Sequence, residues 1–74
     1  MARLKVLSGK AVCQILVKHG FMEARRRGSH IVMQKNVSPV ETITVPIPDH
    51  KEIRTGTLLS IIRQSRIPRT EFEI

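Results

Sequence analysis

The stretch MEARRRGSHIVMQ, residues 22–34, decides the fold, because it contains two strand signals separated by a turn. Met22 and Ala24 alternate with charged residues up to Arg27, and Gly28 then breaks the run. The segment that follows is rich in β-branched and apolar residues. Alternation of this kind is typical of half-buried strands, and a glycine between two such runs is typical of a turn. The stretch therefore predicts two strands joined at a structural turn on Gly28.

A third strand is predicted over residues 42–45, Thr-Ile-Thr-Val, which show the clearest two-residue alternation in the chain. It ends at two prolines, which cannot donate to a strand ladder. Residues 35–41 contain Asn, Ser and Pro, so we expect a hairpin-type loop there. Three consecutive strands most simply form an antiparallel sheet, with His30 on its open face. The expected core face of this sheet consists of Met22, Ala24, Ile31, Met33, Ile43 and Val45.

Helical patterns precede and follow the three strands. Apolar residues at helical spacing predict a helix over residues 9–19, with Ser8 as its N-cap and Gly20 as its exit. A second helix is predicted over residues 55–65, followed by a short turn anchored by Phe72. The order helix, three strands, helix predicts a two-layer α+β domain, with both helices on one face of the sheet. A chain of 74 residues has room for only this single domain, residues 1–74.

The charge of the chain is strongly basic and unevenly distributed. Thirteen Lys and Arg residues against six acids give a net charge of +7. The first 35 residues hold eight of these bases and one acid. A basic half on a small domain favours contact with nucleic acid, although a solvated basic surface remains an alternative. With two Phe and no Trp or Tyr, recognition by stacking bases on exposed rings is disfavoured.

Several site classes are excluded by residue spacing. The candidate metal ligands are Cys13, His19, His30 and His50. They lack the close spacing of structural zinc sites, and no glycine-rich phosphate loop is present, so we expect neither a metal nor a cofactor. The single cysteine rules out an internal disulfide and favours a packing role in a reducing, cytoplasmic setting. No apolar stretch is long enough to span a membrane, and we expect no membrane partner.

His30 is the residue with the clearest chemical potential. Arg25 and Arg27 alternate onto one face of the neighbouring strand, whereas Arg26 is expected at the rim of the sheet. Nearby positive charge favours a neutral imidazole, which can accept a proton. The same guanidinium groups would hold a phosphodiester, so the constellation suits a metal-independent ribonuclease. A surface histidine in a basic binding patch explains these residues equally well, and residue chemistry alone leaves both readings open.

A set of short motifs distributed along nearly the whole chain resembles the HicA toxins of bacterial and archaeal toxin–antitoxin pairs. The motifs are Leu7-Ser8-Gly9-Lys10, Gly20-Phe21, Arg27-Gly28-Ser29-His30, Thr44-Val45-Pro46, His50-Lys51-Glu52, Gly56-Thr57-Leu58, Ile61-Ile62-Arg63-Gln64 and Glu71-Phe72. The resemblance implies a double-stranded-RNA-binding-domain-like fold, α-β-β-β-α, which agrees with the order derived above. The chain departs from the family pattern at Ala11 and at Leu59, where an arginine is common; the second change removes a cation from the second helix.

The resemblance also implies a function. It indicates the toxin of a type II toxin–antitoxin pair, an mRNA interferase with His30 as its catalytic residue. Its partners would be mRNA and a HicB-type antitoxin that covers His30. The residues expected to bind RNA are Arg25, Arg26, Arg27, Ser29 and Lys35. The second proton-transfer group stays open among water, Lys35 and the same imidazole acting twice. The alternative function is a non-catalytic RNA-binding module that uses the same basic face.

Overall fold

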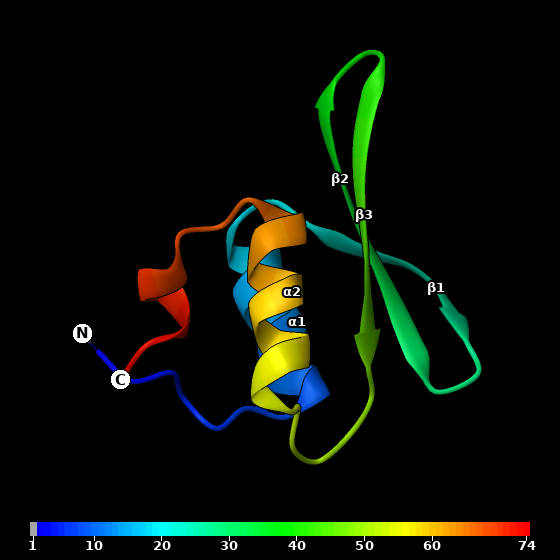
Figure 1. Ribbon diagram of the computed structural model, residues 1–74. Helices are drawn as coiled ribbons and strands as arrows, with labels where there is room; N and C mark the ends of the chain where they lie inside the picture. Colours follow the sequence, from blue (N-terminus) through cyan, green and yellow to red (C-terminus); the bar gives the residue numbers. More distant parts are fainter. Residues whose placement is uncertain (1) are drawn as a thin grey trace.

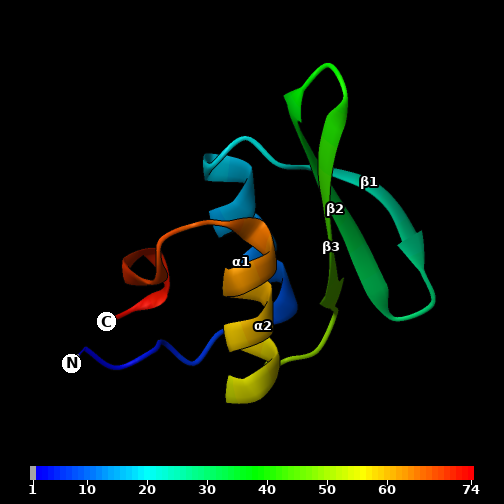
Figure 2. The ribbon, with the colours of Figure 1, turned by 45° about the horizontal axis from the view of Figure 1, so that its top comes forward.

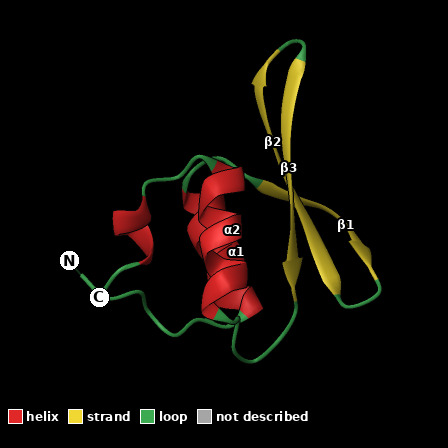
Figure 3. Cartoon of the chain, viewed as in Figure 1, coloured by secondary structure: helices red, strands yellow, loops and turns green. Residues whose placement is uncertain are grey.

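The computed structural model, which describes residues 2–74, has the α-β-β-β-α order predicted from the sequence, followed by a 3₁₀ turn. The elements are α1 (Gly9–Lys18), β1 (Met22–Arg27), β2 (His30–Ser38), β3 (Glu41–Pro48), α2 (Thr55–Ser65) and η1 (Arg69–Phe72). The strands form one antiparallel sheet in the order β1-β2-β3. Both helices pack on the same side of this sheet (Figure 1, Figure 3). The two-layer α+β prediction is therefore confirmed.

The hydrophobic core lies between the helices and the sheet. Val12 and Leu16 of α1 are completely buried, as are Val45 and Ile47 of β3. Apolar residues of α2 and Phe72 of η1 complete this cluster. Of the residues predicted to form the core face of the sheet, four are buried as expected: Ile31, Met33, Ile43 and Val45. Because one face of the sheet is committed to this core, the register of the strands fixes which residues face away from it.

Local hydrogen bonds explain where α1 begins and ends. The Ser8 hydroxyl accepts from the backbone N–H of Ala11 at 3.1 Å, as expected for an N-cap. At the other end Gly20 has a φ of 92°, and the Phe21 N–H donates to the Leu16 carbonyl at 3.0 Å. This left-handed exit makes His19 the C-cap, so the helix ends one residue before the predicted boundary. Within residues 2–74, neither helix has the length and apolar character needed to cross a membrane.

The hairpin loop predicted over residues 35–41 is present, but its predicted length is wrong, because β2 and β3 continue through most of this range. The third strand also runs past its predicted end at residue 45, as far as Pro48. Only two residues, Pro39 and Val40, form the turn. Asn36 pairs with Thr42 across the hairpin, and the Thr42 hydroxyl donates to the Asn36 side chain at 2.9 Å. These cross-strand bonds outweigh the turn preference of the individual residues. The hairpin extends beyond the layer of helices (Figure 1, Figure 2).

The predicted core positions in β1 are also wrong. Met22 is 69% exposed, and Ala24 is exposed as well. A β-bulge between Glu23 and Arg25 shifts the register of β1 against β2. As a result, Met22 pairs with Gln34 on the open face, whereas a strict alternation would place it toward the core.

The two ends of the chain lie side by side (Figure 1). Leu4 forms an isolated antiparallel bridge with Glu73, and the Lys5 N–H donates to the Phe72 carbonyl at 2.8 Å. Phe72 is completely buried, which confirms the predicted final turn and its anchor. The packed ends lie on the side of the helices away from the sheet, and within residues 2–74 no element covers the open face of the sheet (Figure 1).

Candidate active site

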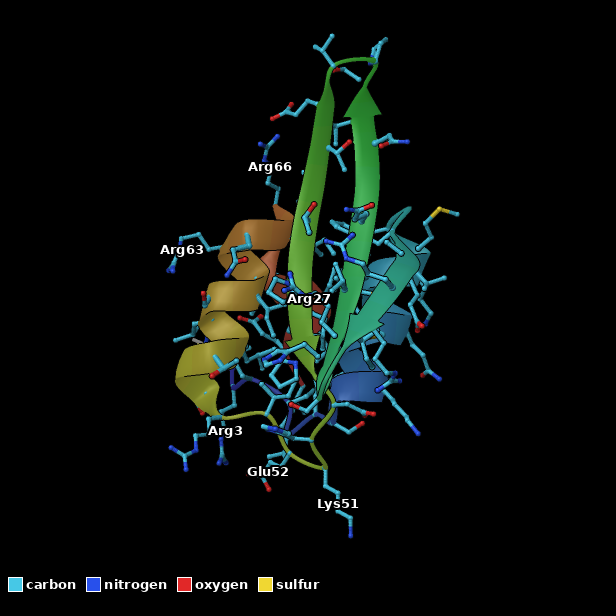
Figure 4. The ribbon with its side chains drawn as sticks, turned by 90° about the vertical axis from the view of Figure 1, so that its right-hand side faces the viewer. Arg3, Arg27, Lys51, Glu52, Arg63 and Arg66 are labelled. Carbon is cyan, nitrogen blue, oxygen red and sulfur yellow. The ribbon has the colours of Figure 1, made fainter. Side chains whose placement is uncertain are left out.

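The open face of the sheet brings His30 together with two arginines of β1. In the antiparallel register, Arg27 is opposite His30, and Arg25 is opposite Val32. These residues border a hollow of about 370 Å³, which we call the His30 hollow. Its lining residues are Arg25, Arg27, His30, Val32, Thr44 and Pro46. Figure 4 looks onto this side of the molecule, where Arg27 extends over the sheet.

The floor of the His30 hollow is apolar. Val32 is on the same side of β2 as His30 but is only 4% exposed. Its cross-strand neighbours are Arg25 on β1 and Pro46 on β3, and their side chains flank it. The hollow therefore combines an exposed imidazole, two guanidinium groups and a small apolar surface. Sequence reasoning missed the lining role of Thr44, although the alternation of β3 already placed it opposite the buried Ile43 and Val45.

A tight turn between β1 and β2 positions His30 on the open face of the sheet. Gly28 has a φ of 56°, a left-handed backbone conformation that residues with a side chain rarely adopt. Ser29 follows it, and Gly28 and Ser29 form the turn between β1 and β2. The Ser29 carbonyl accepts a hydrogen bond from the backbone N–H of Asp49 at 2.8 Å. This bond joins the turn before His30 to the loop that follows β3.

Arg26 lies apart from the His30 hollow. It pairs in register with Ile31, whose side chain is in the core, so it faces the helical side of the sheet. There its guanidinium donates to the Asp49 carboxylate at 2.9 Å. This hydrogen bond lowers the pKa of Asp49 below its usual value. The Asp49 carboxylate thereby holds β1 to the loop that follows β3.

Lys35 is also placed away from the hollow. Strand alternation puts it on the same side of β2 as the buried Ile31 and Met33. Its ammonium group lies 5.9 Å from the centre of the Phe21 ring, a cation–π arrangement beside the end of α1. The sequence could have shown this separation, because Lys35 is five residues after His30 on the same strand. Side chains an odd number of residues apart on a strand point to opposite faces of the sheet.

The other titratable candidates, Cys13, His19 and His50, do not line the His30 hollow. Burial raises the pKa of the Cys13 thiol to about 11, which fits the predicted packing role. His19 is paired with Glu71, with Nε2 and Oε1 3.1 Å apart. The His50 carbonyl accepts from the Gly9 N–H at 2.9 Å and so joins the loop after β3 to the start of α1. Among residues 2–74, no group of three or more His, Cys, Asp and Glu side chains could hold a metal ion.

The fold and the hollow define a class of small α+β domain, in which a sheet face presents one imidazole beside two guanidinium groups of the neighbouring strand. The sequence matches the family described as the HicA toxin of bacterial toxin–antitoxin systems over residues 9–67. This match covers well over half of the chain, so the protein belongs to the HicA toxin family. Searches of curated proteins and of solved structures find no match. Family membership makes the chain a toxin and implies an antitoxin as its partner.

Proposed function

We propose that this toxin is a metal-independent endoribonuclease that cleaves mRNA in the cytoplasm, with His30 as its catalytic residue. The observation that carries the proposal is the placement of exposed His30 among Arg25 and Arg27 in one hollow. An imidazole can move protons near neutral pH, and arginines bind and neutralise phosphate. Together they supply what cleavage of a phosphodiester requires without a bound ion.

The proposed step uses the ribose 2′-hydroxyl as the nucleophile. His30 accepts the proton of this hydroxyl while the 2′-oxygen forms a bond to the adjacent phosphorus. The bond from phosphorus to the 5′-oxygen breaks, and the 5′-oxygen takes up a proton. Arg25 and Arg27 donate hydrogen bonds to the non-bridging oxygens, where negative charge builds up in the transition state. The products are a 2′,3′-cyclic phosphate and a 5′-hydroxyl.

The placement of Lys35 reduces the options for the second proton transfer. Because Lys35 faces the end of α1, it does not reach a phosphate held in the His30 hollow. The proton on the 5′-oxygen then comes from water or from the same His30 imidazole after it has been protonated. In the second case, the imidazole takes one proton from the 2′-hydroxyl and gives one proton to the 5′-oxygen, so it ends the step in its starting state.

The remaining predicted RNA contacts divide into two roles. Ser29 adjoins His30 at the turn, and we assign it a contact with the ribose-phosphate chain beside the hollow. Arg26 is assigned a positioning role, because its bond to Asp49 holds the strand that carries Arg25 and Arg27. Leu59 lies on α2, on the other side of the sheet, so the cation absent there does not alter the hollow.

We further propose that a HicB-type antitoxin neutralises the toxin by covering the His30 hollow with an acidic surface. Charge complementarity would speed the encounter and make association sensitive to salt. Arg27→Glu should therefore slow association with the antitoxin, measured by surface plasmon resonance. Arg63→Glu, the same charge change on α2, serves as the matched control (Figure 4). An equal loss in both variants would place the antitoxin interface elsewhere.

The proposed function is tested by inducing the toxin in cells without its antitoxin and following growth and mRNA integrity. The wild type should arrest growth and fragment mRNA, and His30→Ala should do neither. His50→Ala, in an exposed loop outside the hollow, is the control and should remain toxic. Circular dichroism must show that His30→Ala is folded. Growth arrest with intact mRNA would instead support the non-catalytic RNA-binding module.

A further inference from the structure

Beyond the His30 hollow, the open face of the hairpin carries pairs of uncharged polar side chains. Strand alternation puts Gln34 and Asn36 on the same face of β2 as His30. Their cross-strand partners on β3 are Thr44 and Thr42. We call these four residues the hairpin track. Since Thr44 also lines the His30 hollow, the track begins at its wall and continues along the hairpin.

Each pair of the hairpin track is fixed by a hydrogen bond between the strands. The Gln34 amide donates to the Thr44 hydroxyl at 3.2 Å, and the Thr42 hydroxyl donates to the Asn36 amide oxygen at 2.9 Å. These bonds set the orientation of both amides. They leave an acceptor and a donor on Gln34, and both N–H donors on Asn36, available to a ligand.

The chemistry of the hairpin track suits nucleobases better than phosphates. Its four side chains carry no charge, so they offer nothing to neutralise a phosphate. They also contain no ring on which a base could stack. Amides and hydroxyls instead match the donor and acceptor pattern on the edges of unpaired bases, which is how proteins read single-stranded RNA. Val32 and Pro46, at the start of the track, provide an apolar surface for the adjoining nucleotide.

We propose that the hairpin track is a base-recognition subsite for single-stranded RNA, which selects the sequence next to the phosphate held at His30. The inference rests on the proposed function for the position of cleavage. Successive pairs on the same face stand two residues apart, or about 6.6 Å along the strand. This separation allows neighbouring nucleotides of an extended strand to meet neighbouring pairs of the track.

A binding experiment tests the subsite without requiring cleavage. The chain has only four side-chain amides, those of Gln14, Gln34, Asn36 and Gln64, and two of them lie on the helices. The ¹⁵N-labelled His30→Ala protein is titrated with oligo(U), oligo(A) and oligo(C) of ten nucleotides, and the amide signals are followed by NMR. We expect the signals of Gln34 and Asn36 to shift with at least one RNA. Those of Gln14 and Gln64 should stay in place.

A cleavage experiment tests the selection itself. Cut sites on one natural mRNA are mapped for the wild type, for the double variant Gln34→Ala/Asn36→Ala and for the control Gln14→Ala/Gln64→Ala. Removing the two amides that contact bases should reduce the preference between favoured and other sites by about fivefold or more. The control should cut with the wild-type preference.

The outcomes separate the subsite from the proposed function. Amide shifts at Gln34 and Asn36 without cleavage by the wild type would retain the subsite and refute the nuclease. Cleavage with an unchanged pattern in the track variant would overturn the subsite and leave the nuclease intact. RNA that moves no track signal, or a track that responds only to the antitoxin, also overturns the subsite.

Discussion

Asp49 illustrates how a single residue outside the His30 hollow controls its geometry. Its backbone N–H donates to the Ser29 carbonyl at 2.8 Å, and its carboxylate accepts from Arg26 at 2.9 Å. The two bonds hold the last residues of β1 and the turn before His30 to the same loop. We therefore expect Arg26 to act by positioning Arg25 and Arg27, since its own guanidinium faces away from them.

The pairing of Asp49 with Arg26 predicts a pH dependence. The pKa of Asp49 is lower in the folded protein than in the unfolded chain. The ion pair therefore stabilises the fold at pH values above the pKa of the unfolded chain. This stabilisation is lost as the pH falls through the pKa of the folded protein. Arg26→Gln should return the pKa of Asp49 toward its ordinary value, measured by ¹³C NMR of the carboxyl group. Arg25→Gln, on the open face, is the control. An Asp49 titration that is identical in all three proteins would contradict the role given to this pair.

At the scale of elements, the close approach between α1 and the end of β3 explains why residue 9 is a glycine. A Cβ at Gly9 would lie 2.1 Å from the Pro48 carbonyl oxygen and 3.0 Å from the Asp49 Cα. Both neighbours are backbone atoms, so they cannot move aside without displacing the loop that holds the turn before His30. The start of the first helix and the His30 hollow are thus linked through this loop.

Gly9→Ala should therefore destabilise the domain by about 1–3 kcal/mol, the usual range for an overpacked site. Gly56→Ala in α2 is the matched control, because a Cβ there would meet nothing within 4 Å. The control should be neutral or should stabilise by up to about 1 kcal/mol, since alanine favours helix. Urea unfolding of both variants measures the difference. Equal free energies of unfolding would show that the close approach is unimportant.

The sequence predicted the number, type and order of the elements, but not the length of the β2–β3 hairpin or the bulge in β1. Helical spacing and capping residues located α1 and α2, and alternation placed His30 opposite Ile31 and Met33. The length of the β2–β3 hairpin depends on cross-strand bonds that local preference does not contain. Alternation within one strand also cannot predict the bulge at Ala24, because a bulge is an extra residue relative to the partner strand.

For the residues of the site, strand alternation was a better guide than charge. Alternation alone predicted that Arg25 and Arg27 share the face of His30, and the register confirms this placement. Alternation also set Arg26 apart from them, at the rim of the sheet, and the register shows that it faces the helical side. Grouping Lys35 with the arginines followed its charge and ignored strand parity. The roles of the residues gathered in the hollow remain proposals.

At the scale of the whole molecule, the basic first half of the chain is divided between the two layers. Arg25 and Arg27 line the His30 hollow, whereas Arg26 and Lys35 face the helical side. The surface that we propose to meet RNA phosphates at the hollow is therefore smaller than the net charge of +7 suggests. The salt dependence of RNA binding should reflect those few contacts and not the total charge.

Arg27→Gln should reduce the log–log slope of RNA affinity against salt by about 0.7, the value for one phosphate contact with a single strand. Arg63→Gln removes the same charge from α2 and should leave the slope unchanged (Figure 4). Fluorescence anisotropy with a labelled single-stranded RNA, at several salt concentrations, measures both slopes in the folded proteins. A slope that falls equally in the two variants would mean that binding senses only net charge.

The most direct test of the account is cleavage of a labelled natural mRNA by the purified toxin in excess EDTA. We predict that the wild type cleaves it to products with 2′,3′-cyclic phosphate ends. An oligoribonucleotide spanning a mapped cut should resist when its reacting 2′-hydroxyl is replaced by hydrogen. His30→Ala, folded by circular dichroism, should cut at background rate, and His50→Ala at the wild-type rate. Wild-type-level cleavage by His30→Ala, or activity that is lost in EDTA and restored by a divalent ion, would contradict the account.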